Sequence, residues 1–223
     1  MNKIKDAVTA ASQAGRSVRI KQHTTTAHDS LDALIMQQTP FAGLAHYRQF
    51  LTLQYFLLQD AAVLYQHPSL QLLVADLAER SRFGLLQQDF ADLGWPEPNL
   101  YVAPALTLKA SLPELLGWLY VIEGSKLGAA MLGRQLGQLA LSAEFGGHYL
   151  AGPGAGRGAA WRELLQLFDQ QPLTAAEEAV MFESASQAFM RVRQHLAWLL
   201  QHQALPKATP AAAVQTPSSM AEA

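Results

Sequence analysis

The 223-residue chain contains no cysteine, which excludes disulfides, zinc–thiolate sites, iron–sulfur clusters and thiol nucleophiles together. Charged residues make up only 15% of the sequence, and the formal net charge is −2. A chain without a surplus of basic residues is a poor candidate for nucleic-acid binding. The first residues lack the apolar segment of a signal peptide, and no apolar run reaches the length of a membrane span. We therefore expect a cytoplasmic protein that binds neither nucleic acid nor membrane.

Several common catalytic motifs are also missing. The sequence has no H-E-x-x-H motif for zinc and no paired Glu-x-x-His motifs for a di-iron centre. It has no G-x-S-x-G nucleophile elbow, no P-loop and no Rossmann fingerprint. These absences argue against metalloprotease, ferritin-like, serine-hydrolase and nucleotide-binding functions.

Helical periodicity dominates what is present. Half of the residues are hydrophobic, and no stretch shows the alternation of a half-buried strand. We expect an all-α single domain over residues 16–203, after a flexible lead-in at 1–15 and before a disordered, proline-spaced tail at 204–223. The expected helices cover 17–38, 43–66, 69–93 (with a candidate break near Gly84), 111–141 and 159–169, and a last helix runs from the Thr174 capping box to about Gln203. A glycine-rich loop is expected at 146–158.

The segment 120–132 combines strong helical character with two glycines, Gly124 and Gly128. A glycine inside a helix costs about 1 kcal/mol relative to alanine, so both require a reason. Their spacing of four residues sets them on one helix face, beside Ser125. A face almost without side chains permits either close packing of another helix or close approach of a flat or bulky ligand.

One histidine, His28, has informative neighbours on the first expected helix. An isolated histidine on a helix stripe is most often a core or surface residue without a ligand. Asp32 follows one turn later and can accept a hydrogen bond from Nδ1, directly or through water, which leaves Nε2 free for a metal. Lys21 lies two turns earlier. Taken alone it is a solvated surface lysine, but its ammonium group can also meet a carboxylate at the edge of a large ligand.

These pieces together fit one arrangement. A planar cofactor would be bound axially by His28, covered by the face of Gly124 and Gly128, and held at an acidic rim by Lys21 or nearby arginines. A single ligating histidine opposite a helix face without side chains is what a haem site between two helices requires.

The sequence resembles the bacterial haem oxygenases that produce biliverdin, over about residues 17–200. The resemblance rests on Thr26-Ala27-His28, Pro40-Phe41, the stretch 117–130 with its Gly-Ser-x-Leu-Gly motif, Glu144-Phe145-Gly146, Trp161 and Ala188-Phe189. It implies an all-α, single-domain helical bundle. Haem is then sandwiched between the first, proximal helix and a glycine-kinked distal helix.

The resemblance also implies roles for the matching residues. His28 matches the proximal ligand of the haem iron. Gly124, Ser125 and Gly128 match the catalytic part of the distal helix, whose backbone lies against the haem and its bound dioxygen.

Other matches concern the edges of the haem. Lys21 and Tyr120 correspond to positions that hydrogen-bond a haem propionate in some members, and Phe189 corresponds to a distal-pocket aromatic residue. The family often has Glu where this chain has Asp32. Because aspartate is shorter, its contact with His28 is either direct or through water.

The implied activity is that of an oxidoreductase. Haem is both cofactor and substrate, and it is cleaved at a meso carbon by dioxygen and external electrons to give biliverdin, carbon monoxide and free iron. The implied partners are an electron donor, either a ferredoxin or a flavin reductase, and a bilin-binding photoreceptor as a further candidate.

Three alternatives remain open from the sequence. One is a non-catalytic haem carrier or sensor with the same ligand. Another is a thiaminase-like enzyme on the same fold, although the absence of cysteine counts against its usual chemistry. The third is a helical interaction module, which would leave the two glycines unexplained. Fold alone does not separate these functions.

Overall fold

The computed structural model describes residues 14–152 and 156–203, and the expected lead-in up to residue 13 and the expected tail lie outside these ranges. Within them the chain is helical and without strands, so the predicted all-α fold is confirmed. The α-helices are α2 (Arg16–Gln37), α3 (Leu44–Asp60), α4 (Pro68–Gln71), α5 (Phe83–Asp92), α6 (Leu112–Leu132), α7 (His148–Ala151), α8 (Arg157–Gln170) and α9 (Ala175–His202), with 3-10 helices η1 (Ala62–Gln66), η2 (Ala78–Arg80) and η3 (Gly133–Leu139).

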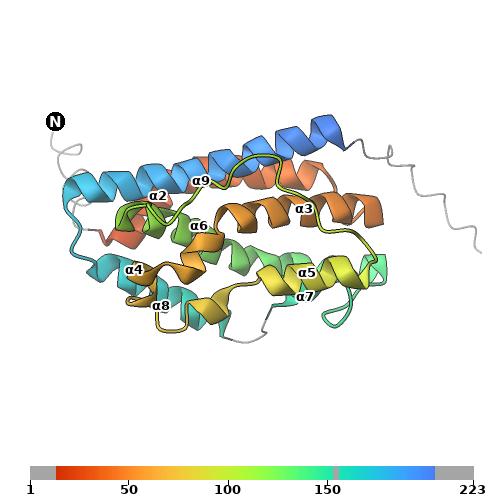
Figure 1. Ribbon diagram of the computed structural model, residues 1–223, viewed down its shortest axis with the longest axis horizontal. Helices are drawn as coiled ribbons and strands as arrows, with labels where there is room; N and C mark the ends of the chain where they lie inside the picture. Colours follow the sequence, from red (N-terminus) through yellow and green to blue (C-terminus); the bar gives the residue numbers. More distant parts are fainter. Residues whose placement is uncertain (1–13, 153–155, 204–223) are drawn as a thin grey trace, which may run out of the picture.

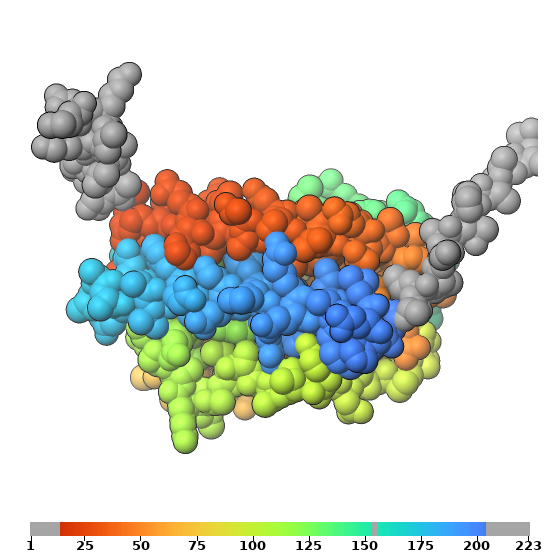
Figure 2. All heavy atoms as spheres, turned by 90° about the horizontal axis from the view of Figure 1, so that it is seen from above, coloured from red at the N-terminus to blue at the C-terminus, as the bar shows by residue number. Residues whose placement is uncertain are grey.

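The helix α6 lies at the centre of the bundle. The long helix α9 packs against it and also against α2 and α3, while α7 and α8 pack against other parts of α6 (Figure 1). Figure 2 shows α9 along one face of the molecule, with α2 on one side and the segment that joins α5 to α6 on the other. The apolar core lies between α9 and the opposite layer, with side chains of α3 and α6 at its middle.

The start of α9 is joined to α2 by ion pairs. Glu178 accepts hydrogen bonds from Nε of Arg16 and from Nε of Arg19, each at 2.9 Å. Both guanidinium groups hold the pKa of Glu178 below its ordinary value. These contacts fix the first turn of α2 on α9.

The same part of α9 also holds the start of α6. The hydroxyl of Ser184 donates to the carbonyl of Glu114 at 2.9 Å. Gly117 lies so close to α9 that a Cβ at this position would collide with the backbone of Met181 and Ala185. Gly117 is therefore a packing glycine, and α2 and α6 are both attached to α9 near their N-terminal ends.

Two capping boxes begin the long helices α6 and α9. The Glu114 carboxylate accepts from the backbone N–H of Ser111 at 2.7 Å, and Glu177 does the same for Thr174 at 2.8 Å. Each bond satisfies a backbone donor that the first helical turn leaves without a partner. Both helix starts agree with the sequence prediction.

A buried polar cluster ties α3 to α9. Asp60, at the end of α3, is fully buried, and its Oδ2 lies 2.7 Å from Nε2 of His195 and 2.6 Å from Nε of Arg191. Burial alone would raise the pKa of Asp60, yet the hydrogen bonds from His195 and Arg191 lower it below the ordinary value. His195 thus has a structural role in this cluster.

The prediction of one helix over 69–93 was wrong. The chain forms the short α4, turns, then η2, and only from Phe83 the regular helix α5. Long-range contacts explain the break, since the carbonyl of Arg80 accepts from Nζ of Lys126, and Nη1 of Arg82 donates to the carbonyl of Tyr149 at 3.4 Å. The break lies before Gly84, at which α5 continues without interruption.

Other predicted boundaries also shift. The second helix ends at Asp60 and continues as η1, and the helix expected to reach residue 141 ends at Leu132 and continues as η3. The expected loop at 146–158 contains the short helix α7.

One stretch is more apolar than expected, since the sequence analysis found no apolar run as long as a membrane span. Over Leu112–Leu139, which comprises α6 and η3, the most apolar window has a mean hydropathy of 1.2, so length and composition alone would suit a membrane span. Inside the bundle, 56% of that window is buried. The core position of α6 accounts for this apolar composition.

Candidate haem site

The helix α2 carries His28 on an open surface. The side chain of His28 is 63% exposed, and its Nδ1 lies 3.0 Å from Oδ1 of Asp29. An N–H at Nδ1 that donates to this carboxylate leaves Nε2 as the nitrogen with a free lone pair. The imidazole is therefore accessible, and in this tautomer Nε2 is free to bind a metal.

Two contacts of His28 were not predicted from the sequence. Asp29, and not Asp32, is the carboxylate beside Nδ1, while Asp32 is exposed to solvent. Phe189 of α9, expected on the distal side, lies against the His28 ring, with ring centroids 6.1 Å apart in an edge-on arrangement. Phe189 therefore restrains the imidazole from the side of α9.

The two glycines singled out in the sequence lie within α6 and have different surroundings. A Cβ built at Gly128 would meet no atom within 4 Å, so the backbone there borders open space. At Gly124 a Cβ would lie 3.3 Å from the ring of Trp161, which belongs to α8. Ser125, between them, is exposed, and its hydroxyl donates to the carbonyl of Ile122 at 2.8 Å. Packing thus explains why residue 117 is glycine, and it partly explains the glycine at 124. It does not explain Gly128, which has no close neighbour.

The side chains of Thr24 on α2 and Tyr120 on α6 lie next to each other. Burial raises the pKa of the Tyr120 hydroxyl, and the adjacent Thr24 hydroxyl partly offsets this shift. The helices α2 and α6 run in the same direction in Figure 1. One turn beyond the contact, on the same faces, come His28 on α2 and Gly124 on α6. The histidine and the glycine face are therefore at the same level of the bundle.

Lys21 and Tyr120 lie toward the N-terminal ends of the two helices. Lys21 is exposed, whereas Tyr120 is half-buried, with its ring 5.4 Å from that of Trp161. This arrangement offers an ammonium group and a phenol hydroxyl on the side of His28 where the helices come together.

A polar cluster supports α6 from behind, and the sequence analysis did not identify it. Nζ of Lys126 donates to the Glu123 carboxylate and to the carbonyl of Arg80, and the Tyr65 hydroxyl donates to Glu123 at 3.1 Å. Burial lowers the pKa of Lys126, and Glu123 partly offsets this. The i, i+3 spacing of Glu123 and Lys126 is a recognisable signal for the pair, but its attachment to Arg80 is not.

Comparisons with known proteins identify the family. A family model described as heme oxygenase matches residues 101–197. The heme oxygenase PigA of Pseudomonas aeruginosa is 38% identical over 178 residues, which cover 79% of this chain and 88% of that protein. This chain belongs to the haem oxygenase family. The NO- and CO-bound heme oxygenase of Neisseria meningitidis matches with a TM-score of 0.76 and 31% identity, over 84% of this chain and 92% of that one.

The family agrees with the resemblance drawn from the motifs. This haem oxygenase is an oxidoreductase that binds haem, and its fold matches that of the Neisseria structure. The surfaces of the site fit such a substrate. The imidazole of His28 is available as an iron ligand, and Gly128 leaves space where any larger residue would project a side chain.

Alanine substitutions at two glycines of α6 separate packing from haem contact. In the haem-free protein, Gly128→Ala should leave the free energy of unfolding unchanged or raise it by up to about 1 kcal/mol, because alanine favours the helix and meets no neighbour. Gly117→Ala should lower that free energy by about 1–3 kcal/mol, because its Cβ overlaps α9. Urea denaturation measures both values.

The same variants are then titrated with haem and followed by absorbance. Gly128→Ala should bind haem more weakly than the unmodified chain although it is at least as stable, since the added methyl group occupies the space next to the backbone. Unchanged haem affinity in Gly128→Ala would show that this face does not contact haem.

Proposed function

We propose that this haem oxygenase binds haem between α2 and α6 and cleaves it at a meso carbon, using dioxygen and electrons from an external ferredoxin or flavin reductase. The products are biliverdin, carbon monoxide and free iron. When bound, haem supplies both the iron at which dioxygen is reduced and the porphyrin edge that is oxidised. The observation that carries the proposal is an exposed histidine on α2 at the same level as the open Gly128 face of α6.

His28 would hold the haem iron through Nε2. Asp29 accepts the hydrogen bond from Nδ1 at 3.0 Å and selects the tautomer, and Phe189 limits rotation of the ring. A neutral imidazole, unlike a thiolate, does not push electron density strongly toward O–O cleavage. This ligand therefore suits oxidation of the porphyrin itself. Asp32, further along the exposed face of α2, contributes negative charge near the site without contacting the imidazole of His28.

Gly124 and Gly128 form the distal surface. Because these residues have no side chains, the backbone of α6 would lie close to a bound haem and would limit the space beside it. No titratable side chain projects from the two glycines, so protons reach the site through ordered water. Ser125 holds such water as an acceptor, because its own proton is engaged by the carbonyl of Ile122.

Lys21 and Tyr120 anchor a haem propionate. An ammonium group and a hydroxyl are suitable donors to a carboxylate, and both lie on the side where α2 and α6 meet. Holding one propionate there would fix the orientation of the haem in the site. That orientation would decide which meso carbon is cleaved.

The proposed setting is the cytoplasm. There the reaction serves either release of iron from scavenged haem or supply of bilin to a photoreceptor, and both uses require the same chemistry.

Turnover in vitro tests the proposed reaction. Haem, a ferredoxin and its reductase are added to the purified protein, and absorbance is followed over time. We expect a broad red-region bilin band with the unmodified chain and none with His28→Ala, because the iron loses its ligand. His23→Ala is the control, since His23 lies on the same helix but packs against Phe182, with ring centroids 5.5 Å apart. Stable haem binding without bilin formation by the unmodified chain would contradict the proposal and indicate a carrier or sensor.

Product analysis tests the anchoring residues. Lys21→Ala and Tyr120→Phe should change the ratio of biliverdin isomers more than the total rate, because the haem gains freedom to rotate while its ligand is kept. Chromatography of the products measures the ratio. An isomer mixture identical to that of the unmodified chain in both variants would refute the anchoring role.

A further inference from the structure

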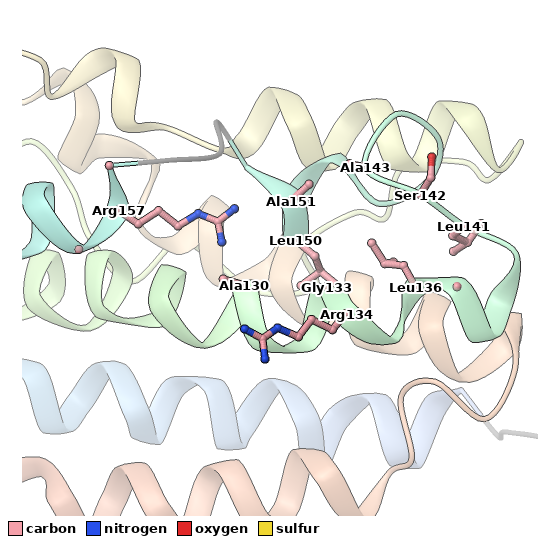
Figure 3. A pocket seen from close by; sticks show the side chains of 13 residues that line it. Ala130, Gly133, Arg134, Leu136, Leu141, Ser142, Ala143, Leu150, Ala151 and Arg157 are labelled. Atoms are coloured by element: carbon pink, nitrogen blue, oxygen red, sulfur yellow. The ribbon is translucent and has the colours of Figure 1, made fainter.

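A cavity borders α6 outside the proposed haem site. Its volume is about 590 Å³, and it lies between the end of α6, η3, the segment 141–143, α7 and the start of α8 (Figure 3). His28, Gly124 and Gly128 are not among its lining residues. This volume is within the range of small-molecule sites, about 300–1,000 Å³.

Part of the cavity wall is apolar. Leu136 of η3, Leu141 and Leu150 of α7 contribute buried side chains, and small residues complete this surface. Figure 3 shows Leu136 and Leu141 toward one side of the cavity, with Leu150 nearer its middle. Such a wall can cover the apolar body of a ligand.

The charged groups of the cavity are both cationic. Arg134 and Arg157 line it, no lining residue is acidic, and neither arginine forms an ion pair within the described residues. Nε of Arg157 is buried, and no described group accepts a hydrogen bond from it. A buried donor without an acceptor is costly, so an acceptor from a ligand would stabilise it.

The electrostatic surroundings strengthen this positive potential. Arg157 is the first residue of α8, where the helix dipole is already positive, and the first turn contains no acidic residue. Behind the cavity lies Arg82, only 3% exposed, whose pKa is lowered by burial and by the charge of Arg157. Its side chain donates to the carbonyl of Tyr149 in α7 at 3.4 Å.

We infer that this cavity binds an organic anion, in which a carboxylate is attached to an apolar body. The carboxylate pairs with Arg157 and Arg134, and the apolar body covers the leucine wall. The inference goes beyond the proposed function and does not depend on turnover. Because α6 contributes to both sites, a ligand here would contact the helix that also bears the glycine face.

Calorimetric titration with sodium 2-naphthoate tests the inference. This probe has a carboxylate on an apolar body, and it is compared with uncharged 2-naphthalenemethanol and with acetate, which lacks the body. The protein is titrated before and after it is loaded with haem, so that entry of the probe into the haem site is recognised. We expect saturable one-to-one binding of naphthoate that persists after haem loading, with each comparison compound binding at least about tenfold more weakly.

Variants assign the binding to the cavity. Arg134→Gln and Arg157→Gln together should raise the dissociation constant of naphthoate about tenfold or more, because two charge-assisted hydrogen bonds are lost. Lys109→Gln removes one positive charge from an exposed position outside the cavity lining and should leave the constant unchanged. The inference is overturned if naphthoate does not bind, if it binds only before haem is added, if the uncharged compound binds equally well, or if the arginine variants bind like the unmodified chain.

Discussion

The attachment of α2 and α6 to the same end of α9 is the constraint on which the rest of the structure depends. Glu178 holds the first turn of α2, and the close contact at Gly117 holds the first turns of α6. The two helices meet again at Thr24 and Tyr120. Beyond this contact, His28 and Gly128 are both accessible at similar levels. Packing near the N-terminal ends of the helices thus leaves an exposed histidine on α2 and an uncovered glycine on α6.

Stabilising charges and functional charges are separated in this molecule. Asp60, His195 and Arg191 form a closed buried cluster, and Glu123 and Lys126 form another against α6. Both clusters satisfy their own hydrogen bonds, as buried polar groups must. By contrast, Lys21 and His28 are exposed on α2 and available to a ligand. The rigid clusters hold the backbone in position, and the exposed groups are those proposed to bind haem.

Sequence patterns predict the helices that carry the site. They fail where contacts between distant residues determine where a helix ends or which side chains touch. The capping boxes at Ser111 and Thr174 are local signals, so the starts of α6 and α9 were predicted. The spacing of Gly124 and Gly128 is also local, and it predicts that both glycines share one helix face. The region 69–93 has helical composition, yet contacts of Arg80 and Arg82 with residues far along the chain interrupt it. Likewise, the contact of Asp29 with Nδ1 of His28 and the contact of Phe189 with the His28 ring were not predicted. Which of two neighbouring carboxylates turns toward a histidine depends on side-chain rotamers, which residue spacing does not determine.

The central claim is that a porphyrin lies between an imidazole from α2 and the backbone of α6. A crystal structure of the haem complex tests it most directly. The account predicts iron bound to Nε2 of His28, with the backbone of Gly124 and Gly128 against the other haem face. Haem bound elsewhere, or protein side chains filling the space between the two helices in the complex, would contradict it.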